Sequence, residues 1–238
     1  MPIYKREIYK IDVRDKIGIY INKKTFQPNL TTISLITSVK KIIKKNQKLL
    51  DLGCGSGIIG CFFLKKKMIN KFYGSDISND AIKCSKYNLK KIKKKYDLRE
   101  SNLLSNWKNE KFDIIINDIS GISSKLNNFT EWFKFAPNNS GKDGIKYTLN
   151  ILKNYKKHLN KNGSLIFPVL GLSNRKKLVS YLKKEKINYV ILDKKTWPLP
   201  LTLKKHKKTL HKLKKQNIIN YEEKFGSMYT STEVFCCK

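Results

Sequence analysis

Alternation of apolar and polar residues near the start of the chain predicts a β-hairpin over residues 3–26. The stretches EIYKIDV and KIGIYIN alternate apolar and polar side chains, so that Ile17, Ile19 and Ile21 fall on one face. The stretch TFQPNLTT then breaks the pattern. We expect two short antiparallel strands in this region.

The remaining chain alternates strand-like and helix-like segments. Short apolar runs predict strands at KLLDLG, KFYGSD, FDIIIN, SLIFPVLGL, YVILD and TEVFCC. Helical apolar spacing predicts helices at residues 36–45, at SGIIGCFFLKKK, after an N-cap at Ser78, at residues 145–159 closed by Asn162–Gly163, and at residues 178–182. Strands that alternate with helices through short loops favour an α/β fold, with a parallel sheet covered on both faces.

Polar residues stand where these strands end. They are Asp51, Asp76, Asn102 and the pair Asn117–Asp118. Ligands of parallel sheets bind beyond the carboxyl ends of the strands. We therefore expect these side chains to line one rim of the sheet and to form the candidate site.

The charge of the chain adds a candidate partner. The 238 residues carry a formal net charge of +33, which favours RNA or the ribosome as a partner. Of the 51 basic residues, however, only Arg6, Arg14, Arg99 and Arg175 are arginine, the residue that phosphate sites prefer. Lys, Ile and Asn are also the residues that an AT-rich genome favours. A lysine-rich surface of either origin predicts nonspecific polyanion binding at low salt.

Hydrophobic runs and cysteine spacing indicate the cellular compartment. No apolar run approaches the length of a membrane span, and the N-terminal MPIYKREIYK lacks the apolar core of a signal peptide. The five cysteines include no CxxC pair, so neither a disulfide framework nor a metal site is indicated. These features predict a reduced, cytoplasmic protein.

The stretch LLDLGCGSG carries the strongest chemical signal. Gly53, Gly55 and Gly57 let the chain turn tightly beside a ligand, and Asp51 precedes the first glycine. An acid at that position would repel a pyrophosphate but suits a cationic ligand. The stretch resembles motif I of the class I S-adenosylmethionine (SAM) methyltransferases. The resemblance implies that the glycine loop passes the methionine part of SAM and that Asp51 holds its ammonium group.

The same resemblance assigns further cofactor contacts. Asp76, at the end of YGSDIS, would accept hydrogen bonds from both ribose hydroxyls. Asn102 would accept from the adenine amino group, and Glu100 is a neighbouring alternative for that role. The full set of cofactor-binding residues that it implies is Thr32, Asp51, Gly53, Cys54, Gly55, Gly57, Asp76, Ile77, Asn102 and Leu103.

The stretch FDIIINDIS falls at the strand of that family whose end faces the methyl group. Amino-group methyltransferases carry Asn or Asp, two prolines and an aromatic residue there. This sequence keeps Asn117 but continues with Asp118 and Ile119, so the stacking surface for a planar acceptor is missing. Either Trp132, Phe133 or Trp197 supplies an aromatic ring, or the acceptor is not a planar amide.

We predict catalytic roles for Asn117 and Asp118. Asn117 would orient the acceptor, and Asp118 would take a proton or hold a cationic acceptor if it points inward. Successive strand side chains alternate, so only one of the two is expected to face the acceptor directly. Asn117 is the expected one, because it matches the family position, and Asp118 would then brace the loop through backbone amides.

Two more stretches are similar to the release-factor glutamine methyltransferases within the small-domain methyltransferase group. They are PNLTT, with Pro28 and Thr32, and GKDGIKYTLNILKNYKKHLNKNGSLIF. The resemblance spans roughly residues 15–170. It implies an α/β, Rossmann-like fold with a mostly parallel seven-stranded sheet and helices on both faces. The family's separate N-terminal helical domain is missing, and the hairpin stands in its place.

The lysine-rich segment at residues 197–220 has no counterpart in the resemblance. Pro198 and Pro200 stiffen an extended turn beside Trp197, and a helix with Leu203, Leu210 and Leu213 on one side follows. The segment is either a basic substrate-docking element or a solvated helix packed by its leucines. His206 and His211 are spaced poorly for a shared metal on a helix.

Together these patterns predict an N-terminal hairpin at residues 1–28 and a SAM-binding methyltransferase domain at residues 29–238, with a basic helical insertion near residues 197–220. The expected activity is SAM-dependent methyl transfer to a nitrogen acceptor on a protein or small molecule. An RNA methyltransferase is the first alternative, with RNA or the ribosome held by the lysine-rich surface. A non-enzymatic module that binds SAM or polyanions is the second.

Overall fold

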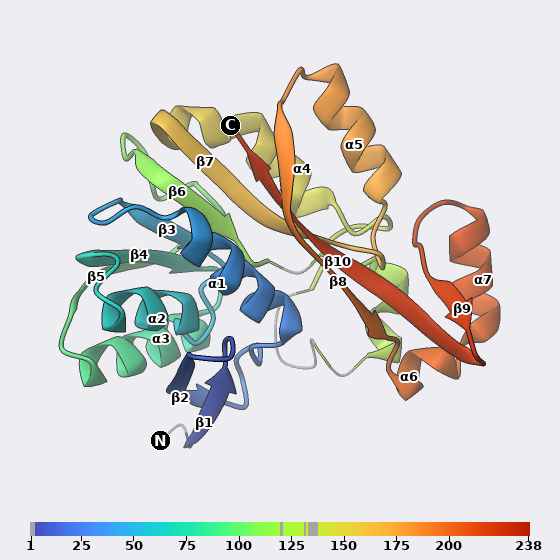
Figure 1. Cartoon of the computed structure of the whole chain (residues 1–238), viewed down its shortest axis with the longest axis horizontal. Coiled ribbons are helices and arrows are strands. Elements are labelled where there is room, and N and C mark those ends of the chain that lie inside the picture. The colour runs from blue at the N-terminus through green and yellow to red at the C-terminus, as the bar shows by residue number, and fades with distance from the viewer. Residues whose placement is uncertain (1–2, 120, 131, 133–137) are drawn as a thin grey trace.

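A central sheet organises the molecule, which a computed structural model describes for residues 3–119, 121–130, 132 and 138–238 (Figure 1). The strand order along the sheet is β5-β4-β3-β6-β7-β10-β8. Neighbouring strands from β5 to β7 are parallel, and β10 is antiparallel to β7 and β8. The bounds are β3 Leu49–Leu52, β4 Lys71–Asp76, β5 Lys95–Glu100, β6 Phe112–Asn117, β7 Leu159–Leu170, β8 Tyr189–Pro198 and β10 Ser227–Cys237. A short strand, β9 (Glu222–Lys224), pairs with β10 and brings the sheet to eight strands, where the sequence predicts seven.

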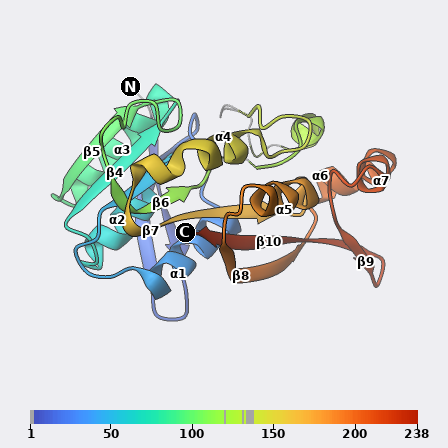
Figure 2. The ribbon, with the colours of Figure 1, turned by 90° about the horizontal axis from the view of Figure 1, so that it is seen from above.

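Helices cover both faces of the sheet, as expected (Figure 2). On one face lie α1 (Leu30–Ile42), α2 (Ile58–Lys65) and α3 (Asn79–Lys91), and on the other lie α4 (Lys146–Asn154) and α5 (Arg175–Lys184). Successive strand residues divide between the two cores, because strand side chains alternate between faces. In β6, Ile114 and Ile116 join the first core and Ile115 joins the second.

The N-terminal hairpin forms a separate two-stranded sheet of β1 (Tyr4–Lys10) and β2 (Lys16–Asn22). Its residues Ile17 and Ile19 are buried in the first core. Asn88 of α3 fixes the hairpin, because its Oδ1 accepts from the Tyr20 amide at 2.7 Å and its Nδ2 donates to the Tyr20 carbonyl at 2.6 Å. The same Nδ2 donates to the carbonyl of Ser56 at 2.9 Å, which ties the hairpin to the glycine loop.

A third apolar cluster lies beyond the end of β10. It joins the 3-10 helix η1 (Ser124–Phe129), α6 (Leu201–Lys204), α7 (Lys207–Lys215) and β10. Leu203, Leu210 and Leu213 are almost fully buried in it. The leucine stripe expected for the lysine-rich segment therefore packs one side of two short helices, and their lysines lie on the outer side.

Two segments differ from the sequence expectations. The helix predicted to close at Asn162–Gly163 instead ends at Asn154, and after the 3-10 turn η2 (Tyr155–His158) strand β7 begins at Leu159. Gly163 lies inside that strand, where a Cβ would stand 3.0 Å from the carbonyl oxygen of Phe112. The glycine thus serves a close strand approach. Strand β5 was not predicted, because as an edge strand it has only half-buried apolar residues.

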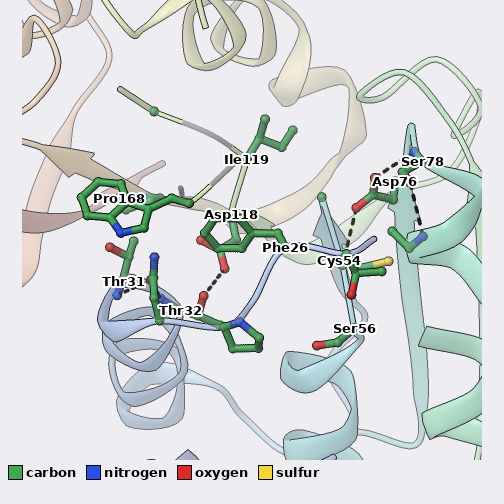
Figure 3. A pocket seen from close by; sticks show the side chains of 18 of the residues that line it. Phe26, Thr31, Thr32, Cys54, Ser56, Asp76, Ser78, Asp118, Ile119 and Pro168 are labelled. Carbon is green, nitrogen blue, oxygen red and sulfur yellow. Dashed lines mark hydrogen bonds between the residues drawn. The ribbon is translucent and has the colours of Figure 1, made fainter. Parts of the chain in front are cut away.

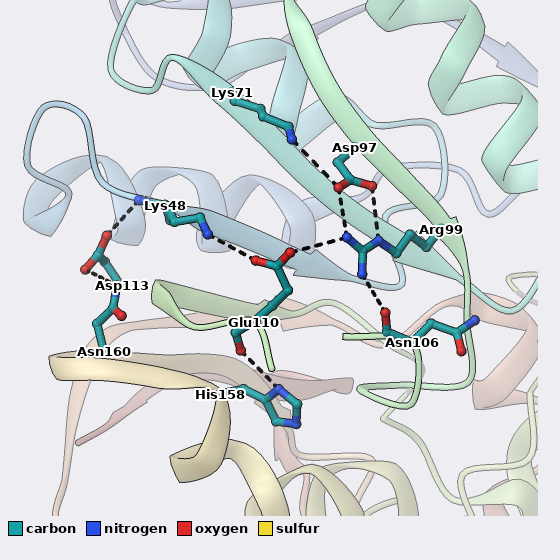
Figure 4. A network of polar contacts seen from close by, with 9 residues as sticks. All are labelled: Lys48, Lys71, Asp97, Arg99, Asn106, Glu110, Asp113, His158 and Asn160. Atoms are coloured by element: carbon teal, nitrogen blue, oxygen red, sulfur yellow. Dashed lines mark hydrogen bonds and ion pairs between the residues drawn. The ribbon is translucent and has the colours of Figure 1, made fainter. Parts of the chain in front are cut away.

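A polar network ties the strands together near their amino ends (Figure 4). Glu110 accepts from Lys48 Nζ at 3.1 Å and from Arg99 Nη2 at 3.5 Å. Arg99 also pairs with Asp97, which Lys71 approaches to 3.7 Å. These side chains are partly exposed, so each pair contributes modestly. The network joins β4 and β5 to the residues just before β3 and β6.

Candidate functional site

A cavity of about 320 Å³ lies at the carboxyl ends of β3, β4 and β6 (Figure 3). Its walls come from the glycine loop, the loops after β4 to β6, the start of α1, and the segment around Trp197. Of the predicted site residues, the cavity is lined by Thr32, Gly53, Cys54, Gly55, Asp76, Ile77, Asn102, Leu103 and Asp118. Asp51, Gly57 and Asn117 stand behind this lining.

The glycine loop turns because its residues adopt left-handed backbone angles. The φ angles of Gly53, Gly55 and Gly57 are 77°, 52° and 76°, a region that strains other residues. A Cβ on Gly53 would approach Ile119 Cγ1 to 2.7 Å. The glycine loop therefore packs directly on Ile119, the residue that follows Asp118.

Asp51 is a buried carboxylate without a hydrogen-bond partner among the described residues. Its side chain is 1% exposed, and both oxygens are unsatisfied. Burial, followed by the charges of Asp118 and Asp76, raises its pKa well above the usual range. Such a group is costly unless a cation or a donor satisfies it. This observation fits a bound ammonium group beside the glycine loop.

Asp76 is held at the end of β4 by two backbone amides. Its Oδ2 accepts from Gly55 at 3.0 Å and its Oδ1 accepts from Ser78 at 2.9 Å. Burial raises its pKa, and these amides act in the opposite direction. A carboxylate has about four acceptor sites, so Asp76 can still accept from hydroxyl groups in the cavity. Ser78 also caps α3, as predicted.

The loop after β5 supplies the far wall. Ile77, Asn102 and Leu103 line the cavity there. The alternative residue Glu100 is not part of the lining, and its Oε2 accepts from Asn79 Nδ2 at 2.6 Å. Asn102 is thus the polar side chain that remains available at this wall.

The two residues after the apolar run of β6 have different surroundings. Asn117 is buried, and its Oδ1 accepts from the amide of Ile119 at 3.1 Å. Asp118 lines the cavity, and its Oδ2 accepts from Thr32 Oγ1 at 2.7 Å. Burial raises the pKa of Asp118 to about 7, although the Thr32 hydroxyl lowers it. The side chain in the cavity is therefore Asp118.

Aromatic rings from distant segments also line the cavity. They are Phe26, Trp132, Tyr147 and Trp197. Trp132 and Trp197 meet edge to face at 5.9 Å, and Trp197 Nε1 donates to Thr232 Oγ1 at 3.0 Å. Of the three aromatic residues considered from the sequence, Phe133 lies outside the described residues. Phe26 and Tyr147 were not among the predicted residues, since only tertiary structure brings them to the cavity.

Comparison with known proteins agrees with this architecture. Residues 12–118 match the family model of the methyltransferase small domain. In this match and in its fold the chain is similar to the class I methyltransferases. In this methyltransferase-like chain the observed strand order places the glycine loop after the central strand β3.

Two curated relatives illustrate the range of this superfamily. The release factor glutamine methyltransferase of Borreliella burgdorferi is 33% identical over 171 residues, which cover 66% of this chain and 58% of the relative. A ribosomal protein L11 methyltransferase of Dictyoglomus thermophilum is 35% identical over 98 residues, which cover 41% of this chain and 32% of the relative. The chain thus spans under two thirds of the length of these relatives.

Solved structures share the fold at low identity. The T. thermophilus 16S rRNA N2 methyltransferase, in complex with AdoMet and guanosine, superposes with a TM-score of 0.60 at 10% identity, covering 99% of this chain and 50% of that one. The L11 methylase of Lactobacillus delbrueckii superposes with a TM-score of 0.54 at 16% identity, covering 89% of this chain and 82% of that one.

In the described residues, no helix combines the length and apolarity needed to cross a membrane, and no cluster of side chains suits a metal ion.

Proposed function

We propose that this chain is a SAM-dependent methyltransferase that acts on a nitrogen atom of a protein or small molecule. The observation that carries the proposal is the unsatisfied, buried carboxylate of Asp51 beneath the glycine loop. It stands behind a cavity whose other end is lined by Asp118 and aromatic rings. The site therefore offers buried carboxyl groups to a cationic cofactor, and a carboxyl group with aromatic rings to an acceptor.

In this proposal one group of residues binds the cofactor and another binds the acceptor. Asp51 holds the ammonium group of the cofactor, directly or through water, and Asp76 accepts from its ribose hydroxyls. Asn102 accepts from the adenine amino group beside Ile77 and Leu103. When bound, SAM supplies a methyl group on a sulfonium, which is a good leaving group. The protein then contributes mainly by holding the acceptor in line with that methyl group.

Asn117 and Asp118 have different roles beside the acceptor. Asn117 braces the loop through the amide of Ile119. Asp118, steadied by Thr32, faces the acceptor. The rings of Trp132 and Trp197, which also line the cavity, would supply an aromatic surface for the acceptor.

An RNA acceptor is the alternative, and the net charge of +33 favours it. A ribosomal RNA small subunit methyltransferase C of Buchnera aphidicola is also 35% identical over 127 residues, covering 42% of this chain and 37% of that one. Among the described residues of the cavity lining, however, Lys24 is the one cation, and the lysines of α7 belong to a separate surface. The described lining of the cavity therefore offers one cation to an RNA backbone.

Calorimetry with SAM and its demethylated product tests the cofactor half. We expect micromolar affinity, about −8 kcal/mol. Asp76→Ala should weaken it by about 1.5–3 kcal/mol, because a charged acceptor is lost. Asp80→Ala removes an acid from the neighbouring helix, outside the cavity lining, and should leave the affinity unchanged. A folded protein that binds neither compound would refute the proposal.

Methyl-labelled SAM tests the second half. The full chain is incubated with cell extract and labelled SAM, and the products are then treated with RNase or protease. Label that protease releases, or that stays in small molecules, supports a protein or small-molecule acceptor. RNase-sensitive label supports the RNA alternative. Binding of SAM without transfer into any fraction would favour the non-enzymatic module.

A further inference from the structure

The acceptor end of the cavity presents a carboxylate where an amide would be expected. Asn117 cannot offer its amide oxygen freely, because the oxygen already accepts from Ile119. That donor exists because residue 119 is isoleucine, whereas a proline would have no N–H. Asp118 enters the cavity instead. A carboxylate recognises a different class of acceptor than an amide oxygen does.

The surroundings of Asp118 favour a positively charged acceptor. Three carboxylates, Asp51, Asp76 and Asp118, lie close enough for the charges of the other two to act on Asp51. The rings of Phe26, Trp132, Tyr147 and Trp197 line the same cavity, together with aliphatic side chains such as Ile122 and Leu170. Aromatic faces attract ammonium groups, most strongly where water is excluded. A carboxylate beside several rings is thus an arrangement suited to an amine.

We propose that the acceptor is a primary amine, carried on a peptide or small molecule and bound as its ammonium form, and that Asp118 is the catalytic residue that removes its proton. This inference rests on the proposed methyltransferase function and specifies its substrate class. An ammonium group has no lone pair, so it cannot attack a methyl group until a base takes a proton. An amide or an aromatic base needs no such step before the attack.

Methyl transfer to the amine begins with loss of a proton. The Asp118 carboxylate accepts one proton from the ammonium, which frees the nitrogen lone pair. The lone pair forms the new N–C bond to the methyl carbon while the C–S bond breaks, and its electron pair stays on sulfur. The products are a methylammonium, a neutral thioether and a protonated Asp118. Release of the product returns the proton of Asp118 to solvent.

The groups around Asp118 support this role. Burial raises its pKa to about 7, which suits a base at neutral pH. Thr32 holds Oδ2 by its hydroxyl at 2.7 Å and thereby fixes the carboxylate. The other titratable groups among the described lining residues are Cys54, Asp76, Tyr147 and Lys24, with Asp51 behind the lining. The acids disfavour a second negative charge, and an incoming ammonium relieves this repulsion.

The fate of the label identifies the acceptor chemistry. After transfer from methyl-labelled SAM to cell extract, the protein and small-molecule products are hydrolysed in strong acid. Methylated amines survive and keep the label, whereas a methylated amide releases labelled methylamine and a methyl ester releases methanol. We expect the label to remain on an amine. Release as methylamine or methanol, or removal of the label by RNase, would overturn the amine proposal while leaving methyl transfer intact. Absence of label from every fraction would instead count against the proposed function.

Two variants test the role of Asp118 itself. Asp118→Asn should lower kcat by roughly 100-fold or more, as loss of a general base does, with SAM affinity largely retained. Asp113→Asn makes the same change at the other end of β6 and should leave kcat nearly unchanged. Wild-type kcat/KM should rise with pH through a midpoint at or below about 7 and then level off.

Thr32→Val separates a base from a structural carboxylate. The Thr32 hydroxyl lowers the pKa of Asp118, so its removal should move the kcat/KM midpoint to higher pH. A merely structural Asp118 would lose activity in the variant without moving the midpoint. An unshifted midpoint in Thr32→Val, or an Asp118→Asn variant that keeps its wild-type rate, would refute the catalytic role.

Discussion

The stability of the ligand-free protein should increase when Asp118 is replaced by asparagine. Burial raises the pKa of this carboxyl from 3.8 to about 7 in the folded chain. The folded state therefore holds the proton more tightly than the unfolded state. The stabilising contribution of this proton is complete below pH 4 and is lost as pH rises from about 4 to about 7. Above pH 7 the folded protein bears the full cost of ionising Asp118.

The magnitude follows from the width of that window. A span of about three pH units at about 1.36 kcal/mol each gives about 4 kcal/mol. It is an upper limit, because water in the cavity screens the carboxylate. A domain of this size changes its melting temperature by about 2–4 °C per kcal/mol. The difference between Asp118→Asn and wild type should thus be near zero at pH 4 and reach up to about 8–16 °C at pH 8.

Thermal unfolding of both proteins from pH 4 to pH 8, without SAM, measures this difference. The amide oxygen of the variant can still accept from Thr32, so the hydrogen bond at the site is preserved. Asp113→Asn is the control, because its carboxylate accepts from Lys48 N and Asn160 and its replacement should lower the melting temperature. A difference between Asp118→Asn and wild type that is negative at pH 8, or constant across the pH range, would refute the reasoning.

Three further outcomes are expected. Asp51→Asn should weaken SAM binding by about 1.5–3 kcal/mol in calorimetry, because the acidic partner of the ammonium group is lost. Asn88→Ala should lower the free energy of unfolding by about 1–3 kcal/mol and increase proteolysis of the hairpin, because the Asn88 amide forms hydrogen bonds with Tyr20 and Ser56. Asn150→Ala, at an exposed helix position, should change neither measurement. RNA binding in filter assays should be weak at physiological salt and fall steeply with added salt, as counterion release requires; nanomolar binding to one defined RNA would contradict this.

The cofactor half of the site could be predicted from sequence because its determinants are local. The glycines, Asp51 and Asp76 lie on or beside strands that short apolar runs mark clearly. The topology then brings strand ends together whatever the loops contain. Strand β5 was missed for the opposite reason, since Tyr96 and Leu98 are only half-buried at the sheet edge.

The acceptor half depends on tertiary structure and was predicted only in part. Phe26, Tyr147 and Trp197 come from segments more than a hundred residues apart at the extremes, and no local pattern relates them. The orientation of Asn117 follows from a local feature, the N–H that Ile119 offers where a proline would not. Asparagine side chains often accept from the backbone two residues ahead. That preference predicts the observed turn and leaves Asp118 to face the cavity.

The contrast between the surface and the cavity is consistent with two separate uses of charge. The chain carries a net charge of +33, yet the cavity and its floor hold three carboxylates against Lys24. At physiological ionic strength the field of surface lysines is screened over about 8 Å, whereas contacts inside a buried cavity are screened far less. A cationic ligand therefore meets a weakly repulsive exterior and a strongly attractive interior. An exterior shaped by genome composition can coexist with an interior selected for cations, because the two act over different distances.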